Sequence, residues 1–151
     1  IDSLNKLTNM IDLMYPAVHL LKDGLVYGIV NDQKMKTASL SLLNVFTDSL
    51  VVDSLGNQIK IKNAYKTGWG TIIWGFHPLI KGRLVKVDFS INDSSKISLA
   101  DFKEVIIERL QKKYPKQFYF FSSKEKLLEK VAQALSYREV IELFLYDVGN
   151  D

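Results

Sequence analysis

The chain has 151 residues, of which 47% are hydrophobic and 25% are charged, and its formal net charge is +3. This composition is typical of a soluble globular protein of one domain, rather than of a disordered or membrane protein. The sequence contains no cysteine, which excludes disulfides, zinc ribbons and thiol nucleophiles. Its apolar runs are far shorter than the ~20 residues of a membrane-spanning helix, so no transmembrane segment is expected. The lack of cysteine does not settle the compartment, which is left unknown with the cytoplasm favoured.

The beginning of the chain predicts a helix followed by a strand. Apolar residues recur at three- and four-residue spacing across residues 1–22, which predicts an N-terminal helix that is kinked at Pro16. Gly24 would end this helix, since glycine readily adopts the left-handed conformation found after many helices. Leu25–Val30 is short, apolar and β-branched, which indicates a buried strand.

The middle of the chain predicts antiparallel strands. Ser39–Phe46 and Leu50–Asp53 are strand-like, and a hairpin turn is expected around Gly56. After this turn, alternation places the isoleucines on one face of a strand and the lysines on the other, for Ile59, Lys60, Ile61 and Lys62. Two more strands are expected at Trp69–Phe76 and at residues 85–91, and Asn92–Lys96 is expected to be a loop.

The last third of the chain changes to a helical period. Ser98, Ser122 and Ser136 each stand where a helix is expected to begin, the last two with a glutamate three residues later. The second helix would carry Leu127, Leu128, Val131 and Leu135, and Phe118–Phe121 is expected to be a short strand between helices. The order predicts an α+β domain: a mainly antiparallel sheet of about five or six strands, with an N-terminal helix and two or three C-terminal helices packed on it.

The candidate binding site centres on residues 65–77, which contain both tryptophans, three glycines and one of the two histidines. Aromatic residues among glycines indicate a strand surface that another molecule approaches closely, although the same residues could fill the core. Lysines on the same and the preceding stretch would lie beside them. The predicted contact residues are Tyr65, Trp69, Trp74, His77, Lys60, Lys62 and Lys66.

No catalytic, cofactor-binding or metal-binding motif occurs in the sequence, so no catalytic residue, metal ligand or cofactor is assigned. One sparse arrangement could support metal-dependent phosphodiester cleavage. Asp53 and Lys60 would hold a metal and stabilise charge, with Asp48 as a second ligand. Gln58 stands where such sites normally carry an acidic residue, which places this interpretation last.

The favoured interpretation is a non-catalytic protein that docks on a macromolecular partner, because Tyr and Trp are enriched at protein-binding hot spots. In size and composition the chain resembles bacterial toxin-neutralising immunity proteins, without a motif that assigns it to them. The alternative is a module for single-stranded nucleic acid, in which the lysines contact phosphates and Tyr65 and Trp69 stack on bases. Leu143, Leu145 and Tyr146 widen the apolar face of the last helix, which keeps a homodimer open.

Overall fold

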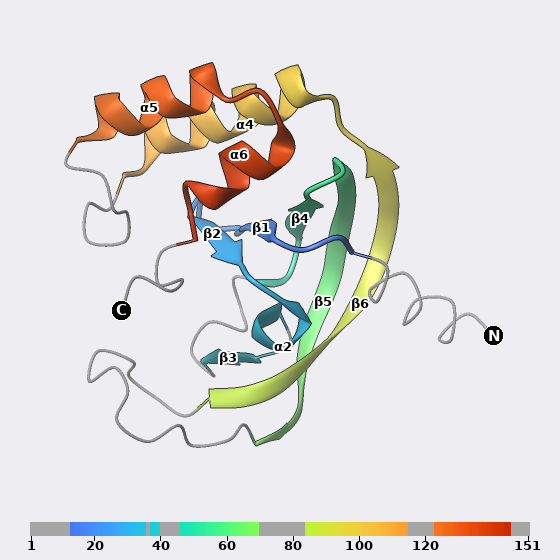
Figure 1. Ribbon diagram of the computed structural model, residues 1–151. Coiled ribbons are helices and arrows are strands. Elements are labelled where there is room, and N and C mark those ends of the chain that lie inside the picture. Colours follow the sequence, from blue (N-terminus) through green and yellow to red (C-terminus); the bar gives the residue numbers. More distant parts are fainter. Residues whose placement is uncertain (1–12, 36, 40–45, 70–83, 115–122, 146–151) are drawn as a thin grey trace.

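The centre of the fold is a six-stranded antiparallel sheet in the order β2-β1-β4-β5-β6-β3 (Figure 1). The structure is a computed structural model that describes residues 13–35, 37–39, 46–69, 84–114 and 123–145, with the backbone alone for 37–39, 65–69 and 84–93. The strands are β1 (Ala17–Leu20), β2 (Val26–Ile29), β3 (Thr37–Ser39), β4 (Ser49–Asp53), β5 (Asn57–Trp69) and β6 (Leu84–Lys96). With the helices that follow it, this sheet confirms the predicted α+β class.

The expected N-terminal helix is wrong for the part of it that the structure describes, because Ala17–Leu20 is strand β1. Both faces of β1 are covered: Ala17 contributes to one hydrophobic cluster, whereas Val18 and Leu20 contribute to another. A strand that is buried on both faces is apolar at every position, so its sequence can also satisfy a helical spacing. Residues 1–12 lie outside the described residues.

The sheet is strongly curved, and its concave side encloses the hydrophobic cluster that contains Ala17, which we call the inner cluster. The pairing of β5 with β6 shifts register after Lys60, Ile61 and Lys66, and such bulges bend and twist the strands that contain them. The short helix α2 (Asp32–Met35) contacts both β2 and β3, which are the two edge strands. The inner cluster consists of Leu13, Ala17, Leu21, Leu25, Ile29, Met35, Phe46, Val51, Ile59 and Ile61.

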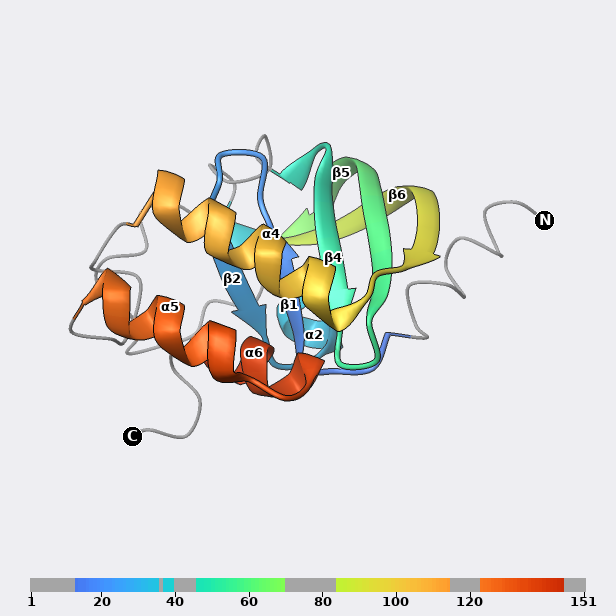
Figure 2. The same cartoon turned by 90° about the horizontal axis from the view of Figure 1, so that it is seen from above.

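The other side of the sheet is covered by helices α4 (Leu99–Lys112), α5 (Lys124–Gln133) and α6 (Tyr137–Glu142). Among the described side chains of the sheet, their apolar faces pack against those of β1, β2 and β4, and β5 and β6 extend beyond the helices (Figure 2). Within the described ranges, no helix combines the length and the apolar character that crossing a bilayer requires. The outer cluster consists of Val18, Leu20, Val26, Val52, Phe102, Ile106, Leu110, Leu127, Val131, Ala134, Val140, Ile141 and Phe144.

Serine side chains begin all three of these helices. Ser98 and Ser136 accept hydrogen bonds from the backbone N–H groups three residues later, at 3.1 Å in each case, as the sequence predicts. The cap of α5 is Ser123 and not Ser122, since its hydroxyl accepts from the N–H of Lys126 at 3.2 Å. The spacing of the residues therefore locates each helix start to within one position.

Several expected boundaries differ from the structure. Asn92–Lys96 is not a loop, because β6 continues through Lys96 and pairs with the first residues of β5. Polar residues are stable in this strand because Ser94, Ser95 and Lys96 are exposed, and none of the described helices covers them. Phe46 is not part of a strand, because it lies between the end of β3 at Ser39 and the start of β4 at Ser49. Residues 40–45, 70–76 and Phe118–Phe121 lie outside the described residues.

Gly56, in the turn after β4, packs against Tyr137 of helix α6, and its replacement tests that contact. Its φ is +83°, and an added Cβ would lie 2.5 Å from Cζ of Tyr137. Gly24 has a similar φ of +100°, but a Cβ there would meet nothing closer than a Lys113 side-chain carbon at 3.6 Å. We expect Gly24→Ala to cost ~1–2 kcal/mol of unfolding free energy for the left-handed backbone. Gly56→Ala should cost clearly more, and equal losses in urea titrations would contradict this packing.

Candidate functional site

Lys60 and Lys62 lie on the surface of β5 as predicted. Both side chains are exposed, whereas Ile59 and Ile61 are buried in the inner cluster. Lys60 pairs with Leu50 on β4, so it belongs to the face of the sheet that the helices cover further along. The two lysines therefore occupy a part of that face which the helices leave open.

The structure does not describe the aromatic side chains of the predicted site. Tyr65, Lys66 and Trp69 lie on the second half of β5, where the structure describes the backbone and not the side chains. The register shift between Lys66 and Gly68 interrupts the alternation of faces just before Trp69. Trp74 and His77 lie outside the described residues. Aromatic stacking beside Lys60 and Lys62 therefore stays a prediction.

Asp53 is a buried structural residue and not an available metal ligand. Its side chain has no exposed surface. One carboxylate oxygen accepts hydrogen bonds from the backbone N–H groups of Leu55 and Asn57, both at 2.9 Å. The other accepts from the backbone N–H of Met14 and from the side-chain amide of Asn57, also at 2.9 Å. These four bonds use the whole acceptor capacity of a carboxylate.

The other members of the proposed metal site do not converge on Asp53. Asp48 precedes β4 and Asp53 ends it, so the two lie at opposite ends of the strand. Lys60 pairs with Leu50, which is about 10 Å along β4 from Asp53 at ~3.3 Å per residue. Among the described side chains, no three of His, Cys, Asp or Glu are grouped as a metal would require. The expected Asp53–Lys60 site is therefore wrong in its geometry.

His19 and Ser49 form a buried pair that resembles a catalytic dyad only in composition. Nε2 of His19 lies 2.6 Å from the Ser49 hydroxyl, and the hydroxyl donates its proton to the Phe46 carbonyl oxygen at 2.5 Å. Since the serine proton is used in this way, Nε2 of His19 must carry the proton that it shares with Ser49. Both side chains are buried, at 3% and 1% exposure. The pair is part of the buried interior, so the Ser49 hydroxyl is not accessible to a substrate as a nucleophile.

Three large hydrophobic side chains are exposed at one end of the molecule. Met14 is 50% exposed, Leu55 is 52% exposed and Leu135 is 82% exposed, and no other large hydrophobic side chain in the described ranges is classed as exposed. They come from the segment before β1, the turn between β4 and β5, and the connection between α5 and α6. We call these three residues the apical patch. A gathering of exposed apolar side chains commonly marks an interaction surface.

Contacts between the three segments bring the apical patch together. Asp53 accepts from the backbone N–H groups of both Met14 and Leu55, and Ser54 N donates to the Met14 carbonyl oxygen at 3.0 Å. Gly56, the neighbour of Leu55, lies directly against the Tyr137 ring, two residues after Leu135. The α5–α6 connection and the β4–β5 turn accordingly lie side by side in both ribbon views (Figures 1 and 2).

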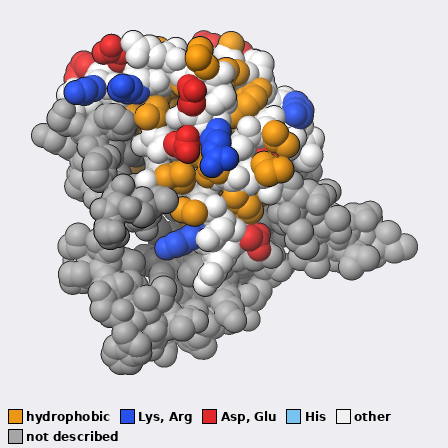
Figure 3. Space-filling model, in the orientation of Figure 1, with side chains coloured by type: hydrophobic (Ala, Val, Ile, Leu, Met, Phe, Trp, Pro, Cys, Tyr) orange, Lys and Arg blue, Asp and Glu red, His pale blue; other side chains and the backbone are white. Residues whose placement is uncertain are grey.

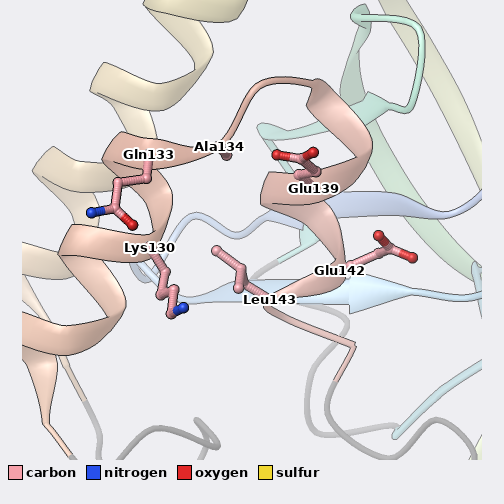
Figure 4. A pocket seen from close by; sticks show the side chains of 6 residues that line it. All are labelled: Lys130, Gln133, Ala134, Glu139, Glu142 and Leu143. Atoms are coloured by element: carbon pink, nitrogen blue, oxygen red, sulfur yellow. The ribbon is translucent and has the colours of Figure 1, made fainter.

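A shallow groove between α5 and α6 adjoins the apical patch (Figure 4). Its volume is about 340 Å³, and Leu143 points into the space between the two helices. Its carboxylates are engaged within the chain, since Glu139 accepts from the Leu135 N–H at 2.6 Å and Glu142 pairs with Arg138 at 3.5 Å. The lining residues are Lys130, Gln133, Ala134, Glu139, Glu142 and Leu143.

The expectation that Leu135 belongs to the second C-terminal helix is wrong. Helix α5 ends at Gln133, so Leu135 leaves the helical stripe of Leu127 and Val131. Nζ of Lys103 on α4 donates to the carbonyl oxygens of Ala132 and Ala134, at 2.7 and 2.9 Å, and holds this helix end. In the view of Figure 3, hydrophobic side chains reach the surface over the helices and the adjoining sheet, among acidic and basic ones.

Replacement of Asp53 separates a structural role from metal binding. Asp53→Asn puts an NH2 group where N–H donors converge, so we expect a loss on the order of 3 kcal/mol or more in urea unfolding. Asp48→Asn is the control, because Asp48 is exposed at φ 62° and Asn tolerates this conformation. The control should change stability by less than ~0.5 kcal/mol. Stabilisation of the native chain by Mg²⁺ that Asp53→Asn abolishes would contradict the structural role.

The buried histidine predicts a dependence of stability on pH. Burial, with a smaller contribution from the Arg109 charge, lowers the pKa of His19 to about 3. In the unfolded chain the pKa returns to ~6.5, so stability is fully present above this pH and falls as the pH decreases, by up to ~1.4 kcal/mol per pH unit. Between about pH 6 and 4.5, His19→Gln should flatten this slope in urea titrations. A slope that stays the same in the His19→Gln variant would refute the assignment.

No protein-family model matches the chain, and no curated protein or solved structure is significantly similar to it. The function must therefore be argued from the geometry of the chain itself. Within the described residues, that geometry offers an apolar surface in the apical patch and a basic surface at Lys60 and Lys62.

Proposed function

We propose that this protein is a non-catalytic binding protein that docks on another protein through the apical patch. The observation that carries the proposal is the gathering of Met14, Leu55 and Leu135 at one end of the fold, although each comes from a different segment. Exposed apolar side chains cost free energy in water, and a partner that covers them recovers it. Inhibition of the toxin-neutralising kind is one form that this function would take.

The chemistry of the patch favours a protein as the partner. The three side chains carry no charge. The half-buried Tyr137 lies against Gly56, next to Leu55 in the sequence, and donates its hydroxyl proton to the Ile97 carbonyl oxygen at 2.7 Å. The adjoining groove keeps its carboxylates engaged internally and adds the partly exposed Leu143 between the polar side chains of Lys130 and Gln133. An apolar centre with a polar rim is the usual anatomy of a protein–protein interface.

A second function, binding of single-stranded nucleic acid, is supported by Lys60 and Lys62. Both side chains are exposed on a part of the sheet that the helices leave open. Two lysines supply little affinity alone, so this function also needs the predicted contributions of Tyr65, Lys66 and Trp69 on the same strand. It therefore ranks after the protein partner.

Reciprocal variants distinguish the two functions. The immobilised full chain is used to capture a protein from the source cell, and the purified partner is then titrated against each variant. Leu55→Asp with Leu135→Asp should weaken its binding on the order of tenfold or more, since hot-spot side chains cost about 1–2 kcal/mol each. Lys60→Glu with Lys62→Glu is the matched control and should leave this affinity unchanged.

The same variants are titrated with a random single-stranded oligonucleotide, followed by tryptophan fluorescence. Salt-dependent quenching that only the lysine variant loses would move nucleic acid to first place. Partner binding that survives in the aspartate variant would show that the apical patch is not the docking surface. Both variants change exposed side chains, so their native folding can be checked by an unchanged urea midpoint.

A further inference from the structure

Met14 places a thioether in the apical patch, where it is 50% exposed. The sequence has no cysteine, so its three methionines are the groups that a hydroperoxide oxidises most readily in this chain. Met35 is only 2% exposed in the inner cluster, and Met10 lies outside the described residues. Among the residues that the structure describes, Met14 therefore carries the thioether that a dissolved oxidant can reach.

The backbone around Met14 is held independently of the Met14 side chain. Its N–H donates to the Asp53 carboxylate at 2.9 Å, and its carbonyl oxygen accepts from Ser54 N at 3.0 Å. The preceding Leu13 is buried in the inner cluster, and the hydroxyl of the following Tyr15 donates to a carboxylate of α2 at 3.2 Å. The Met14 side chain takes part in none of these contacts. Oxidation at its sulfur therefore leaves the fold intact and keeps the altered side chain in the patch.

Oxidation changes the chemical character of this part of the patch. The thioether sulfur attacks one oxygen of a hydroperoxide, so that an S–O bond forms while the O–O bond breaks. The proton moves to the other oxygen, which leaves as water or as an alcohol. The sulfur loses two electrons and the peroxide gains them. The product is a polar sulfoxide, and a partner that covers it must remove its water of hydration.

We propose that Met14 is a redox-sensitive position of the apical patch: a hydroperoxide converts its thioether to the sulfoxide, and the sulfoxide weakens the binding of the partner protein. A thiol-dependent sulfoxide reductase reverses the step, since the oxygen leaves as water and the two thiols form a disulfide. The effect on binding rests on the proposed function. Selective oxidation of the folded chain is a property of the chain alone.

Peptide mass spectrometry of the full chain after treatment with hydrogen peroxide tests the oxidation itself. Met10→Leu is introduced first, so that Met14 is the only methionine between Lys6 and Lys22. In the native chain Met14 should gain oxygen on the order of tenfold or more faster than Met35, because susceptibility follows exposure. In urea the two rates should become equal. Equal rates in the native chain, or a lower urea midpoint of the Met14 sulfoxide chain, would overturn the proposal.

The effect on binding is measured with the purified partner, which is itself never exposed to peroxide. The sulfoxide chain should bind on the order of fivefold or more weakly than the reduced chain, and Met14→Gln should shift the affinity in the same direction. Met14→Leu, in the same Met10→Leu chain, is the matched control, because it keeps the volume and the apolar character of the side chain. It should bind normally, and peroxide treatment should not change its affinity.

The outcomes separate this inference from the proposed function. Unchanged affinity of the sulfoxide chain, when Leu55→Asp with Leu135→Asp removes binding, would overturn the inference and leave the proposed function standing. A loss of affinity on oxidation that Met14→Leu does not prevent would place the sensitive group elsewhere and would also overturn the inference. If the sulfoxide weakens binding and the aspartate variant does not, docking through the whole apical patch fails, and the redox control through Met14 stands.

Discussion

The hydrogen bonds of the Asp53 carboxylate are the constraint on which the candidate surface depends. A fully buried carboxylate is costly unless its acceptor sites are used, and here the four donors come from Met14, Leu55 and Asn57. Leu55 lies in the β4–β5 turn and Asn57 begins β5. Met14 lies on a segment 39 positions before Asp53. The carboxylate thereby fixes the entering chain beside the β4–β5 turn and holds Met14 and Leu55 at one end of the fold.

The curvature of the sheet determines which surfaces are left open. Its concave side is filled by side chains of the sheet, of α2 and of the connecting segments, and among the described side chains its convex side is covered by α4, α5 and α6 over β1, β2 and β4. Arg109 on α4 secures this arrangement by donating to the Leu21 carbonyl oxygen at 2.7 Å. Two different surfaces follow: an apolar one where three segments meet, and a polar one along β5 that includes Lys60 and Lys62.

The sequence predicts the fold class well because its periods reflect burial. Alternation correctly separates Ile59 and Ile61 from Lys60 and Lys62, and the serine caps locate the three C-terminal helices. The prediction from periodicity fails at Ala17–Leu20, because both faces of this strand are buried and its residues do not alternate between apolar and polar. It fails again at Asn92–Lys96, where pairing with β5 decides the structure in place of local propensity.

The candidate site was predicted less well, for a physical reason. Leu55 and Leu135 are ordinary apolar residues in the sequence, and their exposure depends on where a turn and a helix end meet in space. The Lys103 contact that holds the end of α5 joins residues about 30 positions apart, at 2.7 and 2.9 Å. The predicted residues Tyr65, Trp69, Trp74 and His77 remain a hypothesis, because their side chains lie outside what the structure describes.

The most direct test of this account is site-specific photo-crosslinking in the source cell. A benzophenone amino acid is placed at Leu135 in one variant and at Lys62 in another, and both full chains are illuminated. We expect one discrete crosslinked protein from position 135 and none from position 62. A crosslink that forms at position 62 and not at position 135 would contradict it, and the binding surface would then be the open face of β5.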